Sequence, residues 1–411
     1  MLTAETIQKA YQNIKHVVNR TPLQYSARLS NKYKAKVYLK REDLQTVRSY
    51  KIRGAYNLIS SLSEEEKSRG VICASAGNHA QGFAYACASL GIRGIVYMPE
   101  VTPVQKINKV KKFGGQYVQI ELVGRTFDEA FQASKKRAED EGLVYVHPFD
   151  DERTIAGQGS VGIEILEDLH DTDIIIAPIG GGGLISGIST YAKSIISDIK
   201  IFGVDPAGAP KAVEALKEGH PVELTSIDTF IDGAAVKKIG NVTFNIIKEK
   251  VDKVLAVPEG KVCTSMIELY QEEGIIAEPA GALAVAALDS VGSDIQGKNV
   301  VCVISGGNND ISRYPEIMER SLVYEGLKHY FIIEFAQKPG QLKLFLDTVG
   351  VNFDIVRFEY LKKTNKEFGP ALVGIELQNR EDYESFIEGL NKSGFRYFKI
   401  DSNDMLYRYL V

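Results

Sequence analysis

The sequence lacks tryptophan and has only four cysteines and six histidines among its 411 residues. No two cysteines stand in a CxxC pattern and no histidines form HExxH, so the usual spacings of a zinc site are missing. Apolar neighbours surround the cysteines, which are Cys73, Cys87, Cys263 and Cys302. We therefore predict small buried thiols in a reducing compartment rather than disulfides or a metal site.

Long apolar runs are also missing, because no window reaches the roughly 18 residues that span a bilayer. The first twenty residues mix acidic and basic side chains in an amphipathic helical pattern, unlike a signal peptide. Neither sign of charge dominates, since 49 basic and 53 acidic residues give a net charge of −4. These features predict a cytoplasmic protein whose main partner is neither nucleic acid nor an anionic membrane.

The chain is long enough for two or three domains, because single cores stop growing at about 250–300 residues. From residue 36 to about 310, short β-branched runs alternate with longer helical periodicities. This alternation predicts an α/β fold with two open parallel sheets and a cleft between them. One series lies inside the other, so we expect a small domain at 50–147 and a large domain made of 1–49 and 148–320.

The predicted strands of this region are KVYLK (36–40), GVICA (70–74), GIVYM (94–98), QYVQIEL (116–122), LVYVHPF (143–149), DIIIAPIG (173–180), IKIFGVD (199–205), KVLAVPE (253–259) and KNVVCVISGG (298–307). A capping box of Thr126 and Glu129 marks the start of one intervening helix.

The composition changes near residue 321, where aromatic residues become more frequent. The chain has 20 tyrosines and 17 phenylalanines, and 16 of these aromatics lie in the last 91 residues. The order there is strand 329–336, helix 340–350, strands 354–363 and 370–378, helix 380–394 and strand 395–400. This βαββαβ order predicts a separate ferredoxin-like α+β domain at 321–411.

Lys51, in the stretch SYKIRGA, is the first candidate functional residue along the chain. Taken alone it reads as a solvated lysine at the start of an amphipathic helix. A phosphate site and a carboxylate site elsewhere in the chain would change that interpretation. The stretch CASAGNHAQG, from 73 to 82, supplies the carboxylate site, because a strand-to-helix turn presents backbone N–H groups to an anion.

The stretch PIGGGGLISG, from 178 to 187, supplies the phosphate site. Four consecutive glycines between a strand and a helix let the backbone wrap closely around a phosphate. The spacing fits a dinucleotide fingerprint poorly, and no acidic residue follows at the ribose position.

Two further stretches complete the set. Ser305 ends the buried strand of VCVISGGNND, where a hydroxyl can bond a ring nitrogen or simply terminate the strand. Glu278 precedes Pro279 at a helix start, where we expect a capping role rather than catalysis. Together a lysine, a phosphate cup, a ring-nitrogen partner and a carboxylate cradle predict a site for pyridoxal phosphate.

The motifs SYKIRGA, SAGNHAQG, GGGGL and SGGNND, in this order, resemble the fold-type II pyridoxal phosphate enzymes, which share the tryptophan synthase β-like fold. Within them the chain most resembles the biosynthetic threonine dehydratases (threonine ammonia-lyases). The tail segments FAQKPGQLKLFL and DIVRFEYLKK are similar to the ACT-like regulatory domain of that family, so the likeness spans nearly the whole chain.

The resemblance implies the roles of individual residues. The catalytic residues would be Lys51, which carries the cofactor, and Ser305. The cofactor-binding residues would be Lys51, Asn78, Gly180, Gly181, Gly182, Gly183, Leu184 and Ser305. The residues that contact the substrate carboxylate would be Ser75, Ala76, Gly77, Asn78 and His79.

Three positions bear on how far the resemblance extends. Ala76 replaces the second serine that serine racemases use as an acid, which makes racemisation unexpected. The stretch HPFDD, from 147 to 151, resembles the dehydratase form. Asp205 could match one ligand of the divalent cation found in some relatives, but no second carboxylate stands near it, so no metal is expected.

The resemblance implies elimination of water and ammonia from L-threonine to give 2-oxobutanoate, the first step of isoleucine biosynthesis. Alternatives of the same enzyme class are an L-serine dehydratase, a threonine synthase or a cysteine synthase. A catalytically silent amino-acid sensor is an alternative of another class. The ACT-like tail implies inhibition by isoleucine, with valine as an antagonist, in a homo-oligomer that is a dimer or tetramer.

Overall fold

The computed structural model describes residues 2–349, 353–360, 366–401 and 405–407. Its contacts divide the chain into two compact units. The first unit comprises Met1–Glu259 and Glu268–Asn309, and the second comprises Gly260–Ile267 and Asp310–Val411. Among the described helices, none combines the length and the apolar character needed to cross a membrane.

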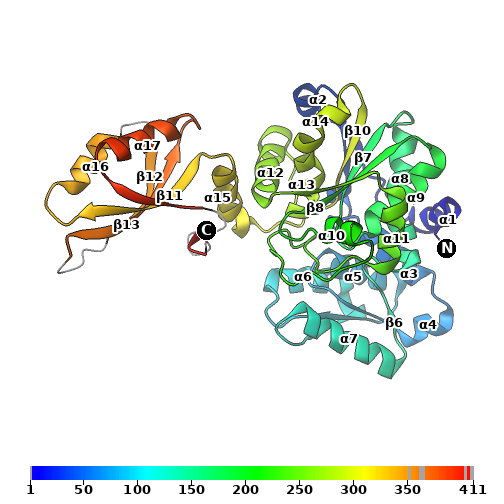
Figure 1. Cartoon of the computed structure of the whole chain (residues 1–411). Coiled ribbons are helices and arrows are strands. Elements are labelled where there is room, and N and C mark those ends of the chain that lie inside the picture. Colours follow the sequence, from blue (N-terminus) through cyan, green and yellow to red (C-terminus); the bar gives the residue numbers. More distant parts are fainter. Residues whose placement is uncertain (1, 350–352, 361–365, 402–404, 408–411) are drawn as a thin grey trace. The chain divides into compact units, whose positions relative to one another are not determined.

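A six-stranded sheet forms the larger layer of the first unit, in the order β1-β2-β10-β7-β8-β9 (Figure 1). All neighbouring strands are parallel except β1 and β2. Every residue of β7 and β10 is buried, as expected for parallel strands covered on both faces. The strands are β1 (Leu23–Tyr25), β2 (Lys36–Arg41), β7 (Ile174–Pro178), β8 (Lys200–Pro206), β9 (Lys253–Val257) and β10 (Asn299–Ile304).

Helices α8 (Glu152–Asp168) and α9 (Gly183–Ile195) pack with this sheet in one apolar core. Helix α13 (Pro279–Ala286) contacts β7, β8 and β10. The other helices of four or more residues between Leu2 and Tyr324, outside the smaller sheet, are α1 (Ala4–Ile14), α2 (Ala27–Tyr33), α4 (Glu64–Arg69), α10 (Lys211–Glu218), α11 (Asn241–Lys250), α12 (Glu259–Glu273), α14 (Gly292–Ile295) and α15 (Tyr314–Tyr324).

A second, wholly parallel sheet lies within the first unit in the order β5-β4-β3-β6. Helix α7 covers one face, and α3, α5 and α6 belong to the core of the other face. The predicted capping box is present, because Thr126 accepts from the Glu129 N–H and Glu129 accepts in return. The elements are α3 (Lys51–Ser60), β3 (Val71–Ala74), α5 (Asn78–Leu90), β4 (Gly94–Met98), α6 (Val104–Gly114), β5 (Val118–Leu122), α7 (Phe127–Glu141) and β6 (Val144–Tyr145).

The second unit contains a four-stranded antiparallel sheet in the order β12-β13-β11-β14. Phenylalanines of the sheet and of its two helices form its core, which explains the aromatic richness of the tail. This order and the βαββαβ succession are those of a ferredoxin-like domain. The elements are β11 (Lys328–Ala336), α16 (Gln341–Val349), β12 (Phe353–Tyr360), β13 (Phe368–Leu377), α17 (Asp382–Lys392) and β14 (Arg396–Ile400).

The predicted fold class is therefore confirmed, with differences in detail. The pattern at 143–149 predicted a full strand, but only Val144 and Tyr145 pair, because the chain then turns away into the loop before α8. The short strand β1 was not predicted, since three residues carry no periodicity. Residues 361–363 of the predicted strand 354–363, and Gly350 of the predicted helix, lie outside the described residues. The domain boundaries stay predictions.

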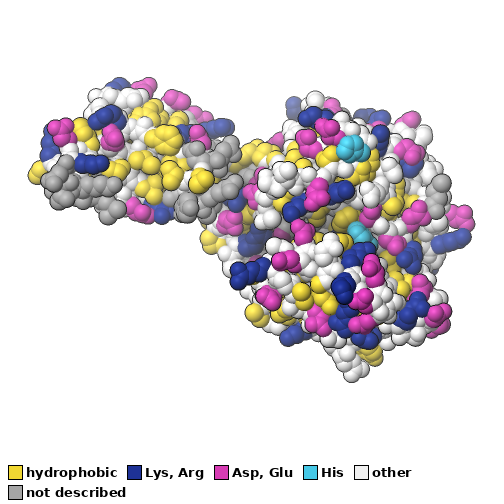
Figure 2. Space-filling model, turned by 60° about the horizontal axis from the view of Figure 1, so that its bottom comes forward, with side chains coloured by type: hydrophobic (Ala, Val, Ile, Leu, Met, Phe, Trp, Pro, Cys, Tyr) yellow, Lys and Arg dark blue, Asp and Glu magenta, His cyan; other side chains and the backbone are white. Residues whose placement is uncertain are grey.

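The face of the molecule in Figure 2 carries basic and acidic side chains side by side rather than in separate fields. This distribution agrees with the small net charge of −4. Within the described residues of this face, no broad basic field suited to a polyanion is visible.

Candidate active site

Each of the two sheets of the first unit has a point where the order of its parallel strands reverses. In the smaller sheet the chain proceeds from β3 outward to β5 and returns beside β3 as β6. In the larger sheet it proceeds from β7 to β9 and returns beside β7 as β10. Ligands of open α/β sheets bind outside the carboxyl ends of strands at such points. The four loops there begin at residues 75, 146, 179 and 305, and they include most of the predicted site.

Lys51 is the first residue of α3 and lies against these loops. The Tyr50 N–H donates to the Ser305 carbonyl at 3.1 Å, so the start of α3 is fixed beside the end of β10. The Lys51 Nζ donates to the Pro148 carbonyl at 3.0 Å and lies 5.1 Å from the centre of the Tyr50 ring. Burial lowers the pKa of Lys51 to about 8, although the Glu278 carboxylate opposes the shift. A neutral amine is therefore accessible near physiological pH.

The glycine loop joins β7 to α9 and leaves a helix end without a cap. Gly182 has φ 98° and provides no side chain, and Gly181 to Leu184 are buried. The first N–H groups of a helix have no partner inside the helix, and a buried, uncapped helix start needs an acceptor from elsewhere. The arrangement suits an anion such as the phosphate of the predicted cofactor.

Two neighbours explain why glycine is required in this loop. A Cβ at Gly181 would lie 2.2 Å from the Phe149 ring, and one at Gly183 would lie 2.4 Å from the Gln158 Oε1. That Oε1 is buried without a hydrogen-bond partner among the described residues, while the Gln158 Nε2 donates to the Pro148 carbonyl at 3.1 Å. Gln158 and Lys51 thus share the Pro148 carbonyl, and Gln158 borders the glycine loop, so the residues present fit a phosphate-bearing group held by a lysine.

Asn78 begins α5 and takes part in a partly buried chain of side-chain hydrogen bonds. Its Nδ2 donates to the Glu278 Oε1 at 2.5 Å, and its Oδ1 accepts from the Asn308 Nδ2 at 2.8 Å. Asn308 also donates to the Val47 carbonyl at 2.8 Å, four residues before Lys51. The side chain of Asn78 is thus held in one orientation.

The loop from Ser75 to Gly77 has room for a ligand. The Ser75 Oγ accepts from the Gly77 N–H at 3.2 Å, and a Cβ built on Gly77 would meet nothing within 4 Å. The His79 ring is buried, and its Nε2 lies 2.9 Å from the Val146 carbonyl. Burial is the main cause that lowers the pKa of His79 to about 3, so its ring is neutral. The His79 Nδ1 is buried without a hydrogen-bond partner among the described residues, so the predicted carboxylate contact of His79 stays a prediction.

Ser305 directly follows β10 and is 2% exposed. Its hydroxyl donates a long hydrogen bond of 3.3 Å to the Ala280 carbonyl at the start of α13. A hydroxyl held so weakly can exchange its partner for a ring nitrogen. The structure therefore places Lys51, the glycine loop, Asn78 and Ser305 around one point.

Glu278 lies beside the predicted site residue Asn78, a position that the sequence pattern did not indicate. We expected a helix cap, and Glu278 is indeed the N-cap residue of α13, but its side chain makes no capping hydrogen bond. It faces Asn78 instead, and burial, with Asp232 nearby, raises the pKa of Glu278 to about 7. The motif AEPAGA gave no signal for this, because the contact joins residues 200 positions apart in the chain.

Asp205 does not face an open cation site. Its Oδ1 lies 2.6 Å from the Lys211 Nζ, and both side chains are fully buried. The same ammonium donates to the Ile179 and Ala234 carbonyls. Within the described ranges, no three His, Cys, Asp or Glu side chains are grouped as metal ligands. Lys211 thus fixes the carbonyl just before Gly180.

Comparison with known families finds two matches along the chain. Residues 14–306 match the family described as "Pyridoxal-phosphate dependent enzyme". Residues 319–410 match "C-terminal regulatory domain of Threonine dehydratase".

Relatives of known name and structure agree with these matches. The chain is 53% identical to the biosynthetic L-threonine dehydratase IlvA of Bacillus subtilis (strain 168), covering 100% of this chain and 98% of that protein. It is 50% identical to that of Lactococcus lactis, covering 100% of both. Among solved structures, the processed threonine deaminase isoform 2 of Solanum lycopersicum is 39% identical, with a TM-score of 0.75 over 78% of this chain and 88% of that one. Maize serine racemase is 32% identical, with a TM-score of 0.72 over 79% and 98%.

Proposed function

The chain belongs to the pyridoxal-phosphate-dependent enzymes and, within them, to the family of the biosynthetic L-threonine dehydratases, and from this membership we propose that it deaminates L-threonine to 2-oxobutanoate and ammonia. The observation that carries the proposal is that Lys51 and Gln158 share the Pro148 carbonyl, while Gln158 borders the uncapped start of α9 at Gly183. This arrangement places an amine of lowered pKa beside a phosphate-type site.

Pyridoxal phosphate, when bound, supplies an electron sink that stabilises negative charge on the substrate Cα. Lys51 would hold the cofactor, and its Nζ, once released, would take the Cα proton as a neutral amine. The N–H groups from Gly180 to Leu184 would bind the phosphate, and Asn78 would hold the ring hydroxyl. Ser305 would meet the ring nitrogen with a neutral hydroxyl, which favours elimination over transamination because it does not keep that nitrogen protonated.

The loop from Ser75 to His79 would receive the threonine carboxylate, chiefly through backbone N–H groups and the Ser75 hydroxyl. This use is consistent with the open space at Gly77. Ala76 offers no proton donor in that loop, so inversion at Cα is not expected. The loop thus orients the substrate without adding a second acid.

The reaction is tested by keto-acid formation from L-threonine, L-serine and no substrate, with the absorbance of the cofactor recorded alongside. We expect keto acid from threonine only when protein and pyridoxal phosphate are both present. Faster turnover of serine would make the chain a serine dehydratase. A bound cofactor without any keto acid would identify a silent sensor and contradict the proposal.

We further propose that the second unit regulates this activity. The match to a threonine-dehydratase regulatory domain supports an amino-acid effector. We propose isoleucine as the inhibitor and valine as its antagonist, acting in a homo-oligomer that is a dimer or tetramer. Coupling of roughly 1–3 kcal/mol would change the apparent affinity for threonine about 5- to 150-fold. Threonine saturation curves of the whole chain with and without isoleucine measure this change, and superimposable curves would contradict it.

Two further predictions concern the cellular compartment and the domain boundaries. The four cysteines are all buried thiols outside any disulfide, as is usual for the reducing cytoplasm. We propose domains at 1–49 with 148–320, at 50–147 and at 321–411. Limited proteolysis near residues 320 and 147 tests these boundaries.

A further inference from the structure

Lys211 is a buried cation beside the glycine loop that has no part in the proposed reaction. Its ammonium contacts three oxygens, which are the Asp205 Oδ1 at 2.6 Å, the Ala234 carbonyl at 3.0 Å and the Ile179 carbonyl. Both charged side chains are fully buried. The three oxygens come from the end of β8, from the loop before α11 and from the residue that joins β7 to the glycine loop.

The number of oxygens fixes the charge of Lys211. Three acceptors need three N–H groups, and only the protonated amine has three. The other carboxylate oxygen of Asp205, Oδ2, accepts from the Ala212 and Val213 N–H groups at 2.7 and 3.1 Å, so Oδ1 is left to the ammonium. The set therefore combines one negative charge, two carbonyl dipoles and one positive charge.

The ammonium holds together two loops that pack closely. A Cβ built on Gly180 would lie 3.3 Å from the Gly233 carbonyl oxygen and 3.7 Å from the Ala234 Cα. The carbonyls of Ile179 and Ala234 both point at the ammonium, and two such dipoles repel each other unless a cation lies between them. Lys211 thus fixes the start of the glycine loop, and with it the N–H groups proposed to bind the cofactor phosphate.

Oxygens of this kind are also the ligands of free cations. Hard metal ions take carboxylate and carbonyl oxygens, and carbonyls replace the hydration shell of K⁺ in channels. Mg²⁺ would need a near-octahedral set at about 2.0–2.1 Å, which three oxygens do not supply. The single carboxylate balances one positive charge. The oxygens around Lys211 therefore have the composition and charge of a monovalent-cation site.

We infer that the Lys211 ammonium is a built-in cation, which fixes the glycine loop as a bound K⁺ or NH₄⁺ ion would, and that the space left by removing its side chain binds such an ion. A tethered cation removes the need for a free one. Cofactor binding by the unaltered chain should therefore not depend on the cation in solution. The inference rests on the proposed use of the glycine loop for the cofactor phosphate.

The test compares Lys211→Ala with Lys211→Met. Alanine leaves a space beside the three oxygens, whereas methionine fills most of it with an apolar chain. Pyridoxal phosphate is titrated by absorbance into each cofactor-free protein in KCl, NH₄Cl or tetramethylammonium chloride at equal ionic strength. Tetramethylammonium is too large for the space and has no N–H group, so it serves as the salt control.

In tetramethylammonium chloride, both variants should bind pyridoxal phosphate roughly ten- to hundredfold more weakly than the unaltered chain, since a charged hydrogen-bond donor is lost. KCl or NH₄Cl should restore most of this affinity in Lys211→Ala and none of it in Lys211→Met. The affinity of the unaltered chain should change less than about twofold between the salts, because their screening is equal. KCl should also raise the thermal midpoint of cofactor-free Lys211→Ala, since an ion that binds only the folded state stabilises it.

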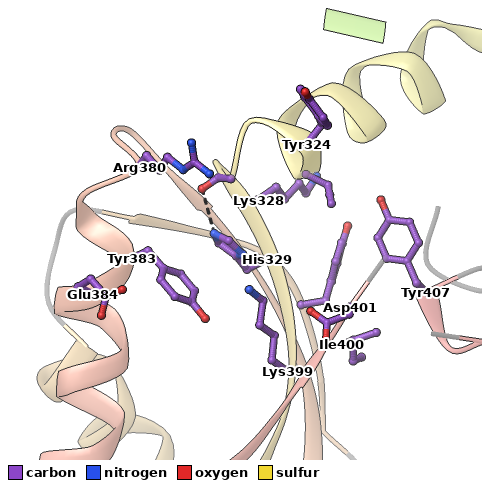
Figure 3. A pocket seen from close by; sticks show the side chains of 13 residues that line it. Tyr324, Lys328, His329, Arg380, Tyr383, Glu384, Lys399, Ile400, Asp401 and Tyr407 are labelled. Carbon is purple, nitrogen blue, oxygen red and sulfur yellow. Dashed lines mark hydrogen bonds between the residues drawn. The ribbon is translucent and has the colours of Figure 1, made fainter. Parts of the chain in front are cut away.

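Lys328→Ala is the matched control. Lys328 lines a cavity of the second unit (Figure 3), and its Nζ lies 2.5 Å from the Glu319 Oε2. Its side chain is mostly buried, so this variant also breaks a shielded pair of lysine and carboxylate. Its affinity for pyridoxal phosphate should equal that of the unaltered chain in all three salts.

The inference fails if neither KCl nor NH₄Cl improves cofactor binding by Lys211→Ala, or if they improve it equally in Lys211→Met. A dependence of the unaltered chain on K⁺ would also overturn it, and that measurement requires no variant to fold. Keto acid from threonine is measured on the same samples. Rescue of cofactor binding by K⁺ without any keto acid would contradict the proposed reaction and leave the inference standing. Normal turnover by the unaltered chain without rescue of Lys211→Ala would do the reverse.

Discussion

The first turn of α3 carries two basic residues, Lys51 and Arg53, whose surroundings differ completely. The Arg53 guanidinium makes ion pairs of 2.8 Å to both Glu42 and Glu164 and a hydrogen bond of 3.0 Å to the Ser160 hydroxyl. Among the residues that the structure describes, the Lys51 ammonium makes one hydrogen bond, to the Pro148 carbonyl. Two residues apart on one helix, one cation is fully satisfied and the other is not.

The network around Arg53 is balanced in charge. Lys40 adds a second cation, with its Nζ 2.7 Å from the Glu164 Oε2, so two cations face two carboxylates in a fully buried cluster. Burial alone would raise the pKa of Glu42, but Arg53 and Lys40 hold that pKa below its usual value. The comparison teaches that the ionic network of Arg53 positions the helix, whereas the Lys51 amine beside it remains available to bind a ligand.

The largest effect is expected from Lys51→Ala, which removes the open cation. Keto-acid formation from threonine should fall by roughly 10²- to 10⁴-fold or more, because the base is lost. The thermal midpoint of the cofactor-free protein should not fall, since Lys51 contributes a desolvated charge with few partners. Assays and melting curves of Lys51→Ala measure both quantities.

Lys111→Ala is the matched control, because Lys111 is an exposed lysine near the end of α6. It should leave activity and melting unchanged. Near-normal turnover by Lys51→Ala would show that the open group is not the catalytic one.

In contrast to Lys51→Ala, Arg53→Met should mainly lower the free energy of unfolding. Removing one partner from a buried ionic network leaves uncompensated charges and costs about 3–5 kcal/mol. Denaturant titration of the cofactor-free protein measures the loss. Arg69→Met removes an exposed partner of Glu65 and should cost less than about 0.5 kcal/mol. Equal losses in the two variants would break the comparison.

Much of the fold was predictable because its signals are local. The runs that became β7 and β10 are continuous and apolar, and the capping box at Thr126 needs only three residues of chain. The aromatic tail and its strand order were read the same way. The pairing of β3 with β6 and of β10 with β7 was not readable, since it depends on contacts between distant segments.

The site residues differ in the same way, between those in local motifs and those whose role depends on distant contacts. The glycine run, Lys51 and Asn78 stand in short motifs with a stated chemistry and were identified. The Pro148 carbonyl has no identity in a sequence, and the role of Glu278 depends on its distant neighbour Asn78. Arg53 stood within the SYKIRGA motif, yet nothing in the pattern distinguished its closed network from the open site next to it.

Lys211→Met tests a second closed cation nearer the site. The variant leaves the buried Asp205 carboxylate without its partner at 2.6 Å, so we expect a loss of about 3 kcal/mol. Because Lys211 also holds the Ile179 carbonyl before Gly180, the affinity for pyridoxal phosphate should fall as well. Cofactor titration and denaturant titration measure the two effects.

The double variant Lys211→Met with Asp205→Asn separates charge from position. It should recover most of the lost stability, since no buried charge remains uncompensated. It should not recover cofactor affinity, because the Ile179 carbonyl stays unheld. Recovery of both would make Lys211 a purely electrostatic partner.

The smallest effect is expected from Glu278→Gln, and it appears as a dependence on pH. Burial raises the pKa of Glu278 to about 7 in the folded chain from about 4.5 in the unfolded one. Between these values the folded protein keeps a proton that the unfolded protein has released, so the free energy of unfolding falls as the pH rises. Glutamine keeps the oxygen that accepts from Asn78 and removes this proton.

Relative to the original chain, the free energy of unfolding of Glu278→Gln should therefore rise by about 1–3 kcal/mol between pH 4.5 and pH 7.5. Denaturant titrations of the cofactor-free proteins at several pH values measure this difference, with the exposed Glu65→Gln as control. Parallel pH profiles for the original chain and Glu278→Gln would mean that Glu278 is already ionised, and hence that the site is as closed as the Arg53 network.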